Sequence, residues 1–396
     1  MADSPKVVIA SAARIPTGRF LGALQPLTAP ELGAVAIRES IRRAGVDPAA
    51  VDEVIMGNVV QAGVGMAPAR QAAVRAGVPV SVPAVTVNKV CGSGLKAVML
   101  AAQAIKAGDG SIYVAGGMES MSNGPYLLPR ARTGYRLGNG EIVDATVHDG
   151  LWCSFEHHHM GNSAEHIAKL YGISRREQDE FALASHRKAV AAASSGRFAA
   201  EIVPVEVPQK KGSVVVAADE TPRPDTSLEA LARLQPAFQP EGGTVTAGNA
   251  PGLSDGAAAL VVVEGGRGRE LGLPALARVT GYATAALEPL LLFAAPPLAI
   301  RKLLSQTGLG LNDFDLIEIN EAFASQVLAN GKDLGWDWQK VNVHGGAVAL
   351  GHPIGASGAR ILTTLIYALR QRGGERGLAV ACLGGGEAVA LSVELA

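Results

Sequence analysis

Several features are scarce in this sequence of 396 residues, and each scarcity excludes a class of function. The 35 basic and 36 acidic residues nearly cancel to a net charge of −1, so no strong field attracts nucleic acid or an anionic membrane. Cysteine occurs only three times, at positions too scattered for a disulfide framework, which fits a reducing compartment. The most apolar later stretch, residues 290–300, is too short to span a bilayer and is interrupted by Pro296 and Pro297.

Targeting signals are also lacking. The first 13 residues contain an early Asp3 and a short apolar run that Arg14 follows, unlike a secretory signal peptide. Residues 393–396 do not form a peroxisomal tripeptide of the Ser-Lys-Leu kind. The sequence therefore predicts a cytoplasmic protein with neither nucleic acid nor a membrane as a partner.

Glycine, by contrast, is abundant at 48 residues and follows no fixed period, which excludes a collagen-like chain. It gathers in clusters, at 116–117, 242–243, 345–346 and 384–386. Clusters of this kind mark places where backbones pass close together or wrap around a ligand.

Short apolar strands alternate with helices along the first 120 residues. Strands are expected at 6–11, 54–57, 83–88 and 111–117, and helices at 29–44, 70–76 and 95–102. This alternation predicts an α/β fold with a mostly parallel sheet covered on both faces. Residues 121–247 differ because prolines, charges and irregular segments are frequent there, and we interpret them as an inserted loop or lid domain. One helix in it is clear, at 174–194, with Ser174 as N-cap and Glu177 completing a capping box.

The last part of the chain repeats the order of the first. In each part a strand ends in asparagine, a glycine-containing turn leads into an apolar helix, and a further strand ends in glycines. Two similar βαβαβ halves would pack as a pseudo-dimer. The expected division is residues 1–120, completed by 248–268, for the first half, 121–247 for the loop domain, and 269–396 for the second half. Corresponding turns would then face each other and bring Cys91 to His352 and Cys382.

Cys91 lies where a predicted strand turns into a predicted helix, within Val90-Cys91-Gly92-Ser93-Gly94. A thiol at a helix N-terminus feels the positive end of the helix dipole, which favours the thiolate. The arrangement is similar to a nucleophile elbow with sulfur in place of a serine oxygen. We therefore interpret Cys91 as a covalent nucleophile, the alternative being a small buried cysteine.

Three further motifs accompany this turn in a fixed order: Asn320-Glu321-Ala322-Phe323-Ala324, Gly351-His352-Pro353-Ile354-Gly355-Ala356-Ser357-Gly358, and Cys382-Leu383-Gly384-Gly385-Gly386. With these four motifs the sequence resembles the thiolase family, nearly from end to end. The resemblance implies two βαβαβ halves in five α-β-α-β-α layers, with an inserted loop domain. It also implies an acyltransferase that acts on acyl-CoA and coenzyme A as substrates and needs no cofactor.

The chemistry of these residue types agrees with that resemblance. Thioester exchange needs a thiolate, a base and donors for the oxyanion, and carbon–carbon bond formation needs a second base. The resemblance implies that Cys91 is acylated, that His352 activates it, and that Cys382 is the second acid and base. It further implies that Asn320 holds a water which acts with His352, and that the N–H groups of Cys91 and Gly384 form an oxyanion hole. Taken singly, His352 could cap a turn, Cys382 could belong to the core, and Asn320 could bond its own backbone.

The resemblance also places the coenzyme A site. Residues that match the wall of its pantetheine channel are His159, Met160, Phe238, Ala247 and Phe323. Arg223 matches a position near the adenosine phosphates, where a guanidinium is a suitable partner. His157-His158-His159 lacks a fourth ligand at a typical spacing, so we expect no metal there and interpret it as a channel wall.

Two stretches depart from the family pattern. Pro251 stands where thiolases usually have a serine that bonds the pantetheine, and proline offers neither hydroxyl nor N–H. Leu292 and Phe293 replace a methionine and a glycine that lie close to the acyl group in many relatives. We therefore expect a reshaped acyl pocket.

The sequence leaves three functions to compare. A thiolase would either condense two acetyl-CoA to acetoacetyl-CoA or cleave a 3-ketoacyl-CoA. A non-catalytic acyl-CoA or lipid carrier would be expected to lose Cys91, His352 or Cys382, and none is lost. A cysteine hydrolase would leave Cys382 and the glycines without a task. From the resemblance we also expect a homo-oligomer, either a dimer or a tetramer.

Overall fold

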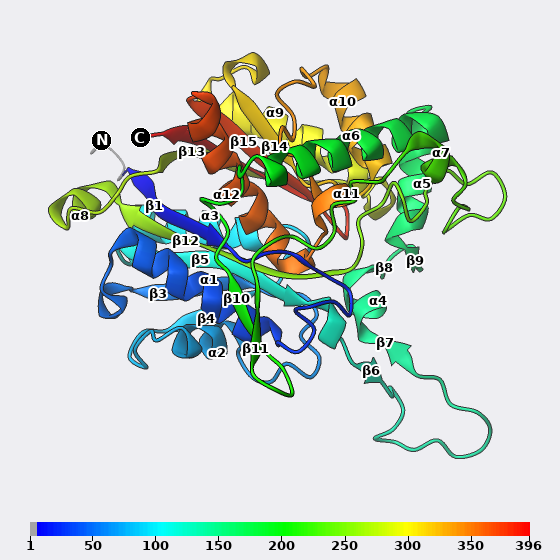
Figure 1. The fold of residues 1–396 in the computed structure, drawn as a ribbon, viewed down its shortest axis with the longest axis horizontal. Helices are drawn as coiled ribbons and strands as arrows, with labels where there is room; N and C mark the ends of the chain where they lie inside the picture. The colour runs from blue at the N-terminus through cyan, green and yellow to red at the C-terminus, as the bar shows by residue number, and fades with distance from the viewer. Residues whose placement is uncertain (1–5) are drawn as a thin grey trace.

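One mixed β-sheet forms the centre of the structure, a computed structural model that describes residues 6–396 (Figure 1). Its ten strands lie in the order β14-β15-β16-β13-β1-β12-β5-β3-β4, with β2 beside β12. The strands of one half are β1 (Val7–Arg14), β2 (Gly18–Arg19), β3 (Glu53–Gly57), β4 (Ala84–Val87), β5 (Ile112–Ser120) and β12 (Ser254–Glu264). Those of the other half are β13 (Ala277–Ala286), β14 (Leu316–Ile319), β15 (Arg376–Leu383) and β16 (Glu387–Leu395).

A seam between β1 and β13 divides this sheet into two similar halves. The two strands pair only where Val8 meets Arg278 and Ile9 meets Ala277. Outward from the seam, β1–β12 and β12–β5 are antiparallel and β5–β3 and β3–β4 are parallel. The other half repeats this order, with β13–β16 and β16–β15 antiparallel and β15–β14 parallel. The predicted internal repeat is therefore visible in the strand order, whereas the predicted domain boundaries stay a prediction.

The expectation of a mostly parallel sheet is wrong, because the pairings on both sides of the seam are antiparallel. β16 follows β15 after residues 384–386, a connection too short for the crossover that a parallel pair requires. β12 returns from the inserted segment and runs against both of its neighbours, β1 and β5. Strand direction here is set by connections that residue pattern alone does not reveal.

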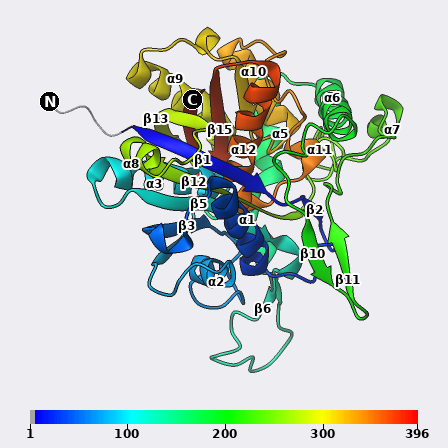
Figure 2. The same cartoon turned by 60° about the vertical axis from the view of Figure 1, so that its left-hand side comes forward.

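Helices form three layers around the two half-sheets (Figures 1 and 2). Between the half-sheets, α3 (Ser93–Ala107) packs against α12 (Ile354–Arg372). The outer face of the first half is covered by α1 (Ala29–Ala44), which packs with α2 (Pro68–Arg75). The outer face of the second half is covered by α9 (Ala295–Thr307), beside α10 (Ala324–Leu334). This is the expected five-layer α-β-α-β-α arrangement.

The inserted segment lies over one end of these layers and, apart from helices α5 (Met160–Leu170) and α6 (Arg175–Ser194), contributes only short elements. Helix α6 begins with the predicted capping box, in which Ser174 and Glu177 bond each other's backbone N–H. The segment is joined to β1 by Arg14, which is buried and pairs with Glu201 at 2.6 Å and Asp219 at 2.7 Å. Its other elements are β6 (Tyr126–Leu127), β7 (Val143–Asp144), α4 (Ala145–Gly150), β8 (Trp152–Cys153), β9 (His158–His159), α5 (Met160–Leu170), β10 (Val205–Pro208), β11 (Ser213–Val216) and α7 (Leu228–Ala232).

Short helices complete the two halves: η1 (Pro48–Ala50), η2 (Met121–Asn123), α8 (Gly265–Glu270), η3 (Pro289–Ala294), η4 (Leu311–Asp313) and α11 (Ala347–Leu350). No helix within residues 6–396 is long and apolar enough to cross a membrane.

Candidate active site

Cys91 occupies a tight turn between β4 and α3. Val90, just before it, has a φ of +45°, which is costly for a β-branched residue and is held by the surrounding structure. Ser93 fixes the turn: its Oγ accepts the Lys89 N–H at 2.8 Å and donates to the Val90 carbonyl at 2.6 Å. A Cβ on Gly92 would lie 2.3 Å from Leu383 Cδ2, so the turn packs directly against β15.

Burial dominates the electrostatics of Cys91. Removal from water raises the pKa of its thiol to about 12, and the Glu119 carboxylate adds a smaller rise. The backbone N–H groups of Cys91 and Gly384 act in the opposite direction and lower the pKa. The expected preference for the thiolate is therefore outweighed, and the free site holds a neutral thiol that needs a base.

His352 is placed to be that base, at the start of α12. Its Nε2 lies 3.3 Å from Asn320 Nδ2, and its Nδ1 lies 2.6 Å from Ser357 Oγ. Ser357 donates its own hydroxyl hydrogen to the Pro353 carbonyl at 2.9 Å, so it accepts from His352. These bonds together assign the imidazole proton to Nδ1 and leave a lone pair on Nε2. Burial, helped by the charge of Arg360, lowers the pKa of His352 to about 3, so the ring stays neutral.

Cys382 is the last residue but one of β15 and is buried. Its pKa is raised well above the usual range by burial and, to a smaller extent, by the nearby Cys91. The chain then turns through Gly385 and Gly386, whose φ values of +87° and +90° suit only glycine. The turn exposes the Gly384 N–H toward Cys91.

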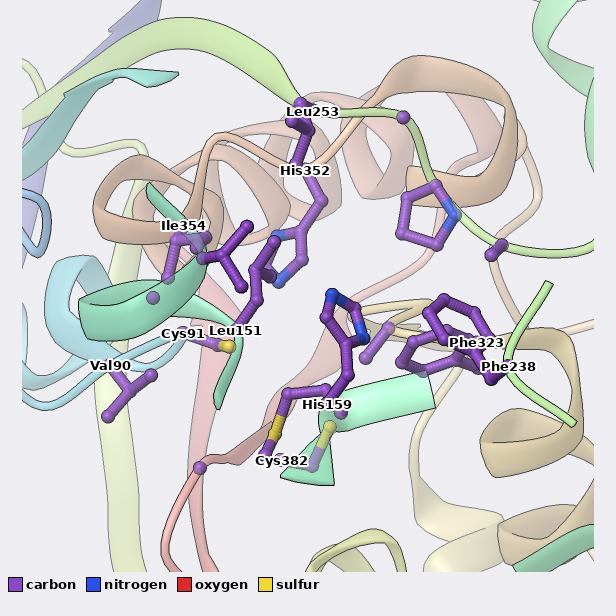
Figure 3. Close-up of a pocket in the computed structure, with 18 of the residues that line it drawn as sticks. Val90, Cys91, Leu151, His159, Phe238, Leu253, Phe323, His352, Ile354 and Cys382 are labelled. Atoms are coloured by element: carbon purple, nitrogen blue, oxygen red, sulfur yellow. The ribbon is translucent and has the colours of Figure 1, made fainter. Parts of the chain in front are cut away.

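These groups converge on one pocket of about 330 Å³ (Figure 3). Cys91 comes from the first half, and His352, Cys382 and Gly384 come from the second, so neither half holds the site alone. The same pocket is lined by the predicted channel residues His159, Met160, Phe238, Ala247, Pro251, Leu292 and Phe323. Asn320 lies behind His352, where its Oδ1 is buried and has no hydrogen-bond partner within residues 6–396.

Arg223 is the one predicted residue that the structure places apart. It lines a neighbouring, more polar hollow together with Arg19 and His186, whose Nδ1 accepts the Arg223 N–H at 3.1 Å. The two hollows share the wall residues Ala247, Ala250, Gly252 and Leu253. Arg223 therefore lies at the far end of a continuous surface that begins at Cys91.

A row of aromatic rings forms one wall of the pocket, and only part of it was predicted. His159 stacks on Phe238 at 4.7 Å, Phe238 meets Phe323 edge-on at 6.2 Å, and Phe323 meets Phe293 at 5.4 Å. His159 Nδ1 accepts the Gly161 N–H at 3.0 Å, which leaves its proton on Nε2. Burial lowers the pKa of His159, so the ring is a neutral donor in an otherwise apolar wall.

Sequence reasoning missed two contributors to this site. Ser357, which holds His352, lies inside the quoted Gly-His-Pro motif, and its position five residues after His352 was the available signal. Leu151 comes from the inserted segment and, with Ile354, lines the pocket next to Cys91. Within residues 6–396, no three His, Cys, Asp or Glu side chains are grouped to hold a metal ion. His158 instead lies 2.9 Å from Ser163 Oγ through its Nε2.

Comparisons with known proteins agree with this geometry. The family model described as "Thiolase, N-terminal domain" matches residues 7–266, and "Thiolase, C-terminal domain" matches residues 273–395. The chain is 55% identical to an acetyl-CoA acetyltransferase of Escherichia coli (strain K12) over 388 residues, which is 98% of each chain. It is 54% identical to an acetyl-CoA acetyltransferase of Cupriavidus necator over 389 residues, which is 98% of this chain and 99% of that protein. The crystal structure of the Bacillus anthracis acetyl-CoA acetyltransferase superposes with a TM-score of 0.98 at 45% identity, over all of both chains.

Proposed function

Because this chain belongs to the thiolase family and is an acyltransferase, we propose that it moves acetyl groups between coenzyme A thioesters through an acyl-Cys91 intermediate. In one direction it condenses two acetyl-CoA to acetoacetyl-CoA. In the other it cleaves a 3-ketoacyl-CoA with coenzyme A. The observation that carries the proposal is the meeting of two thiols and a neutral imidazole in one apolar pocket.

The first half-reaction uses Cys91 and His352. Nε2 of His352 takes the thiol proton as the sulfur attacks the thioester carbonyl, so that Cys91 does not have to exist as a free thiolate before it attacks. The N–H groups of Cys91 and Gly384 stabilise the oxyanion. When the carbon–sulfur bond to coenzyme A breaks, the leaving thiolate takes the proton of the Cys382 thiol, which leaves Cys382 as a thiolate and His352 protonated at Nε2.

The second half-reaction needs Cys382. Its thiolate removes a proton from the carbon next to the carbonyl of a second acetyl-CoA, and the resulting enolate attacks the acetyl group on Cys91. A carbon–carbon bond forms, the bond to the Cys91 sulfur breaks, and that sulfur recovers its proton from Nε2 of His352. His352 Nε2–H and a water held by Asn320 would bind the enolate oxygen, and the unpaired Asn320 Oδ1 supports such a water.

Coenzyme A would lie along the surface that joins the two hollows. The methylene and methyl groups of its pantetheine arm suit the wall formed by Phe238, Phe323 and Pro251, and the His159 Nε2–H can donate to one of the carbonyl oxygens of the arm. Its phosphates suit the guanidinium of Arg223. Since Pro251 offers no donor, we expect this part of the arm to be held by packing alone.

We further propose that the protein works as a homo-oligomer, a dimer or a tetramer, in the cytoplasm. β4 is the last strand of the sheet, and Val85 on it is 41% exposed. The neighbouring Met66 and Val80 are 90% and 76% exposed, so a second copy could cover this edge. Cys91 and Cys382 are both unbridged, and the mechanism needs both as thiols, which a reducing compartment such as the cytoplasm preserves.

Mass spectrometry of the intact protein after brief exposure to acetyl-CoA tests the proposal. Wild type should gain one acetyl group, Cys91→Ala should gain none, and Cys382→Ser should be acetylated yet fail to form acetoacetyl-CoA. If wild type binds acetyl-CoA without gaining an acetyl group, the chain is a carrier. If it gains the group and loses it only to water, the chain is a hydrolase.

A further inference from the structure

An ion pair joins the two catalytic turns from outside the pocket. Lys89, two residues before Cys91, donates through Nζ to both carboxylate oxygens of Glu387, at 2.8 and 2.7 Å. Glu387 is the first residue of β16, immediately after the glycine turn that follows Cys382. Neither side chain lines the pocket that holds Cys91.

The pair matters because the two turns belong to different halves of the molecule. Cys91 presents the attacking sulfur, and Gly384 presents the N–H that would face the oxyanion, so their relative position decides whether the hole fits the transition state. Directly between Lys89 and Cys91 lies Val90, with its strained φ of +45°. Strain of this kind persists only where the surrounding structure holds it from several sides.

Ser93 and Gly92 also stabilise the Cys91 turn, but neither makes a directional contact with the Cys382–Gly384 turn. Ser93 bonds the backbone of its own turn, at Lys89 N and the Val90 carbonyl. Gly92 packs against Leu383, a non-directional apolar contact. The Lys89–Glu387 pair adds a directional link between the turns, in which one ammonium group contacts both carboxylate oxygens, and it lies next to residues 384–386, which have no side chains to make such a link themselves.

We propose that Lys89 and Glu387 are positioning residues that hold the Cys91 turn against the Cys382–Gly384 turn. The side chains are 22% and 38% exposed, and an ion pair with this exposure contributes little to global stability. The ion pair instead fixes the relative position of the Cys91 and Gly384 N–H groups, which form the oxyanion hole. The inference rests on the proposed function, since it concerns the same acyl transfer.

The experiment measures kcat and KM for thiolysis of acetoacetyl-CoA, together with acetylation of Cys91 by intact mass, for Lys89→Met, Glu387→Gln and the double variant. We expect kcat to fall about three- to tenfold in each single variant while KM changes less than about twofold, because only alignment is lost. The double variant should be no slower than the slower single variant. The reversed pair, Lys89→Glu with Glu387→Lys, should recover part of the rate, limited by Lys96, whose charge lies close enough to Lys89 to interact with it.

A matched control is the pair Arg301–Asp333, which also joins two distant segments, at 2.7 Å, with exposures of 50% and 27%. Arg301→Met and Asp333→Asn should change kcat by less than about twofold, because this pair lies on α9 and α10, away from the pocket. If the Lys89 and Glu387 variants match this control, or if their effects simply multiply in the double variant, the inference is overturned. If wild type itself is never acetylated, it is the proposed function that fails.

Discussion

The Cys91 turn and the His352 turn begin the two helices at the centre of the molecule, yet they perform opposite chemical tasks. α3 begins with Ser93-Gly94-Leu95, and the similar sequence Ser357-Gly358-Ala359 starts at the fourth residue of α12. The first turn presents a proton donor and nucleophile, and the second presents a proton acceptor. The difference shows how a repeated unit can supply both partners of an acid–base pair once the two copies face each other.

The corresponding serines show how the two turns diverged. Ser93 accepts a backbone N–H, from Lys89, and so fixes the strained path of the chain. Ser357 accepts from the imidazole of His352 and so fixes a tautomer. Both serines donate to a carbonyl a few residues earlier, Val90 in one case and Pro353 in the other. The same hydroxyl therefore orders backbone in the nucleophile half and a side chain in the base half.

α3 and α12 cross each other, and at this crossing each helix contributes an equivalent glycine to the contact. A Cβ on Gly358 would lie 2.4 Å from the Leu95 nitrogen, and a Cβ on Gly94 would lie 2.7 Å from the Ala359 nitrogen. Because backbone atoms cannot move aside, Gly94→Ala and Gly358→Ala should each lower the free energy of unfolding by about 1–3 kcal/mol. This loss should exceed the gain of up to about 1 kcal/mol in helix propensity.

Urea denaturation measures this effect, and the double variant sharpens it. Once the helices have separated to admit one methyl group, the second should cost less, so the two losses should not add. Gly252→Ala is the control, since a Cβ there meets no atom within 4 Å and should change stability by less than about 0.5 kcal/mol. A Gly358→Ala protein as stable as wild type would show that the helices are not locked at this crossing.

Exchange of either serine for alanine should separate their two roles. Ser357→Ala removes the acceptor for His352 Nδ1–H, so acetylation of Cys91 should slow by about 10- to 100-fold as the ring samples the wrong tautomer. The ¹⁵N chemical shifts of His352 should report Nδ1–H in wild type and in Ser93→Ala, and a mixture in Ser357→Ala. Equal tautomer populations in all three proteins would contradict the division of labour between the serines.

Local signals in the sequence predicted the elements whose formation depends on neighbouring residues. The capping box of α6 is one case, because Ser174 and Glu177 bond within a single turn. Strand direction was not predicted, since β12 and β16 are placed by the connections before them rather than by their own residues. The internal repeat was nevertheless sufficient to predict from the sequence that Cys91, His352 and Cys382 lie close together.

The electrostatic state of the site could not be predicted in the same way. The position of Cys91 before a helix indicated a thiolate, yet burial outweighs the helix dipole and raises its pKa to about 12. The contacts within the aromatic row were also not predicted: the resemblance placed His159, Phe238 and Phe323 on the channel wall and Phe293 near the acyl pocket, but their rings meet only in the folded chain. Burial and long-range contact are properties of the whole fold.

The pH dependence of stability should distinguish the two turns by a smaller effect. The pKa of His352 falls from 6.5 to about 3 on folding, so its contribution to stability is complete above pH 6.5 and is lost as the pH falls toward 3. The pKa of Cys91 rises from 9.0 to about 12, so its contribution is complete below pH 9 and is lost as the pH rises toward 12. At 1.36 kcal/mol per pH unit, the losses are about 2 kcal/mol at pH 5 for His352 and about 1.4 kcal/mol at pH 10 for Cys91.

Urea denaturation across this pH range measures these losses. The free energy of unfolding should fall less steeply at acid pH in His352→Asn, and less steeply at alkaline pH in Cys91→Ser, than it does in wild type. If either substitution weakened the pH dependence of the free energy of unfolding at both acid and alkaline pH, the titrations of His352 and Cys91 would be coupled, and neither group could be assigned a separate protonation state.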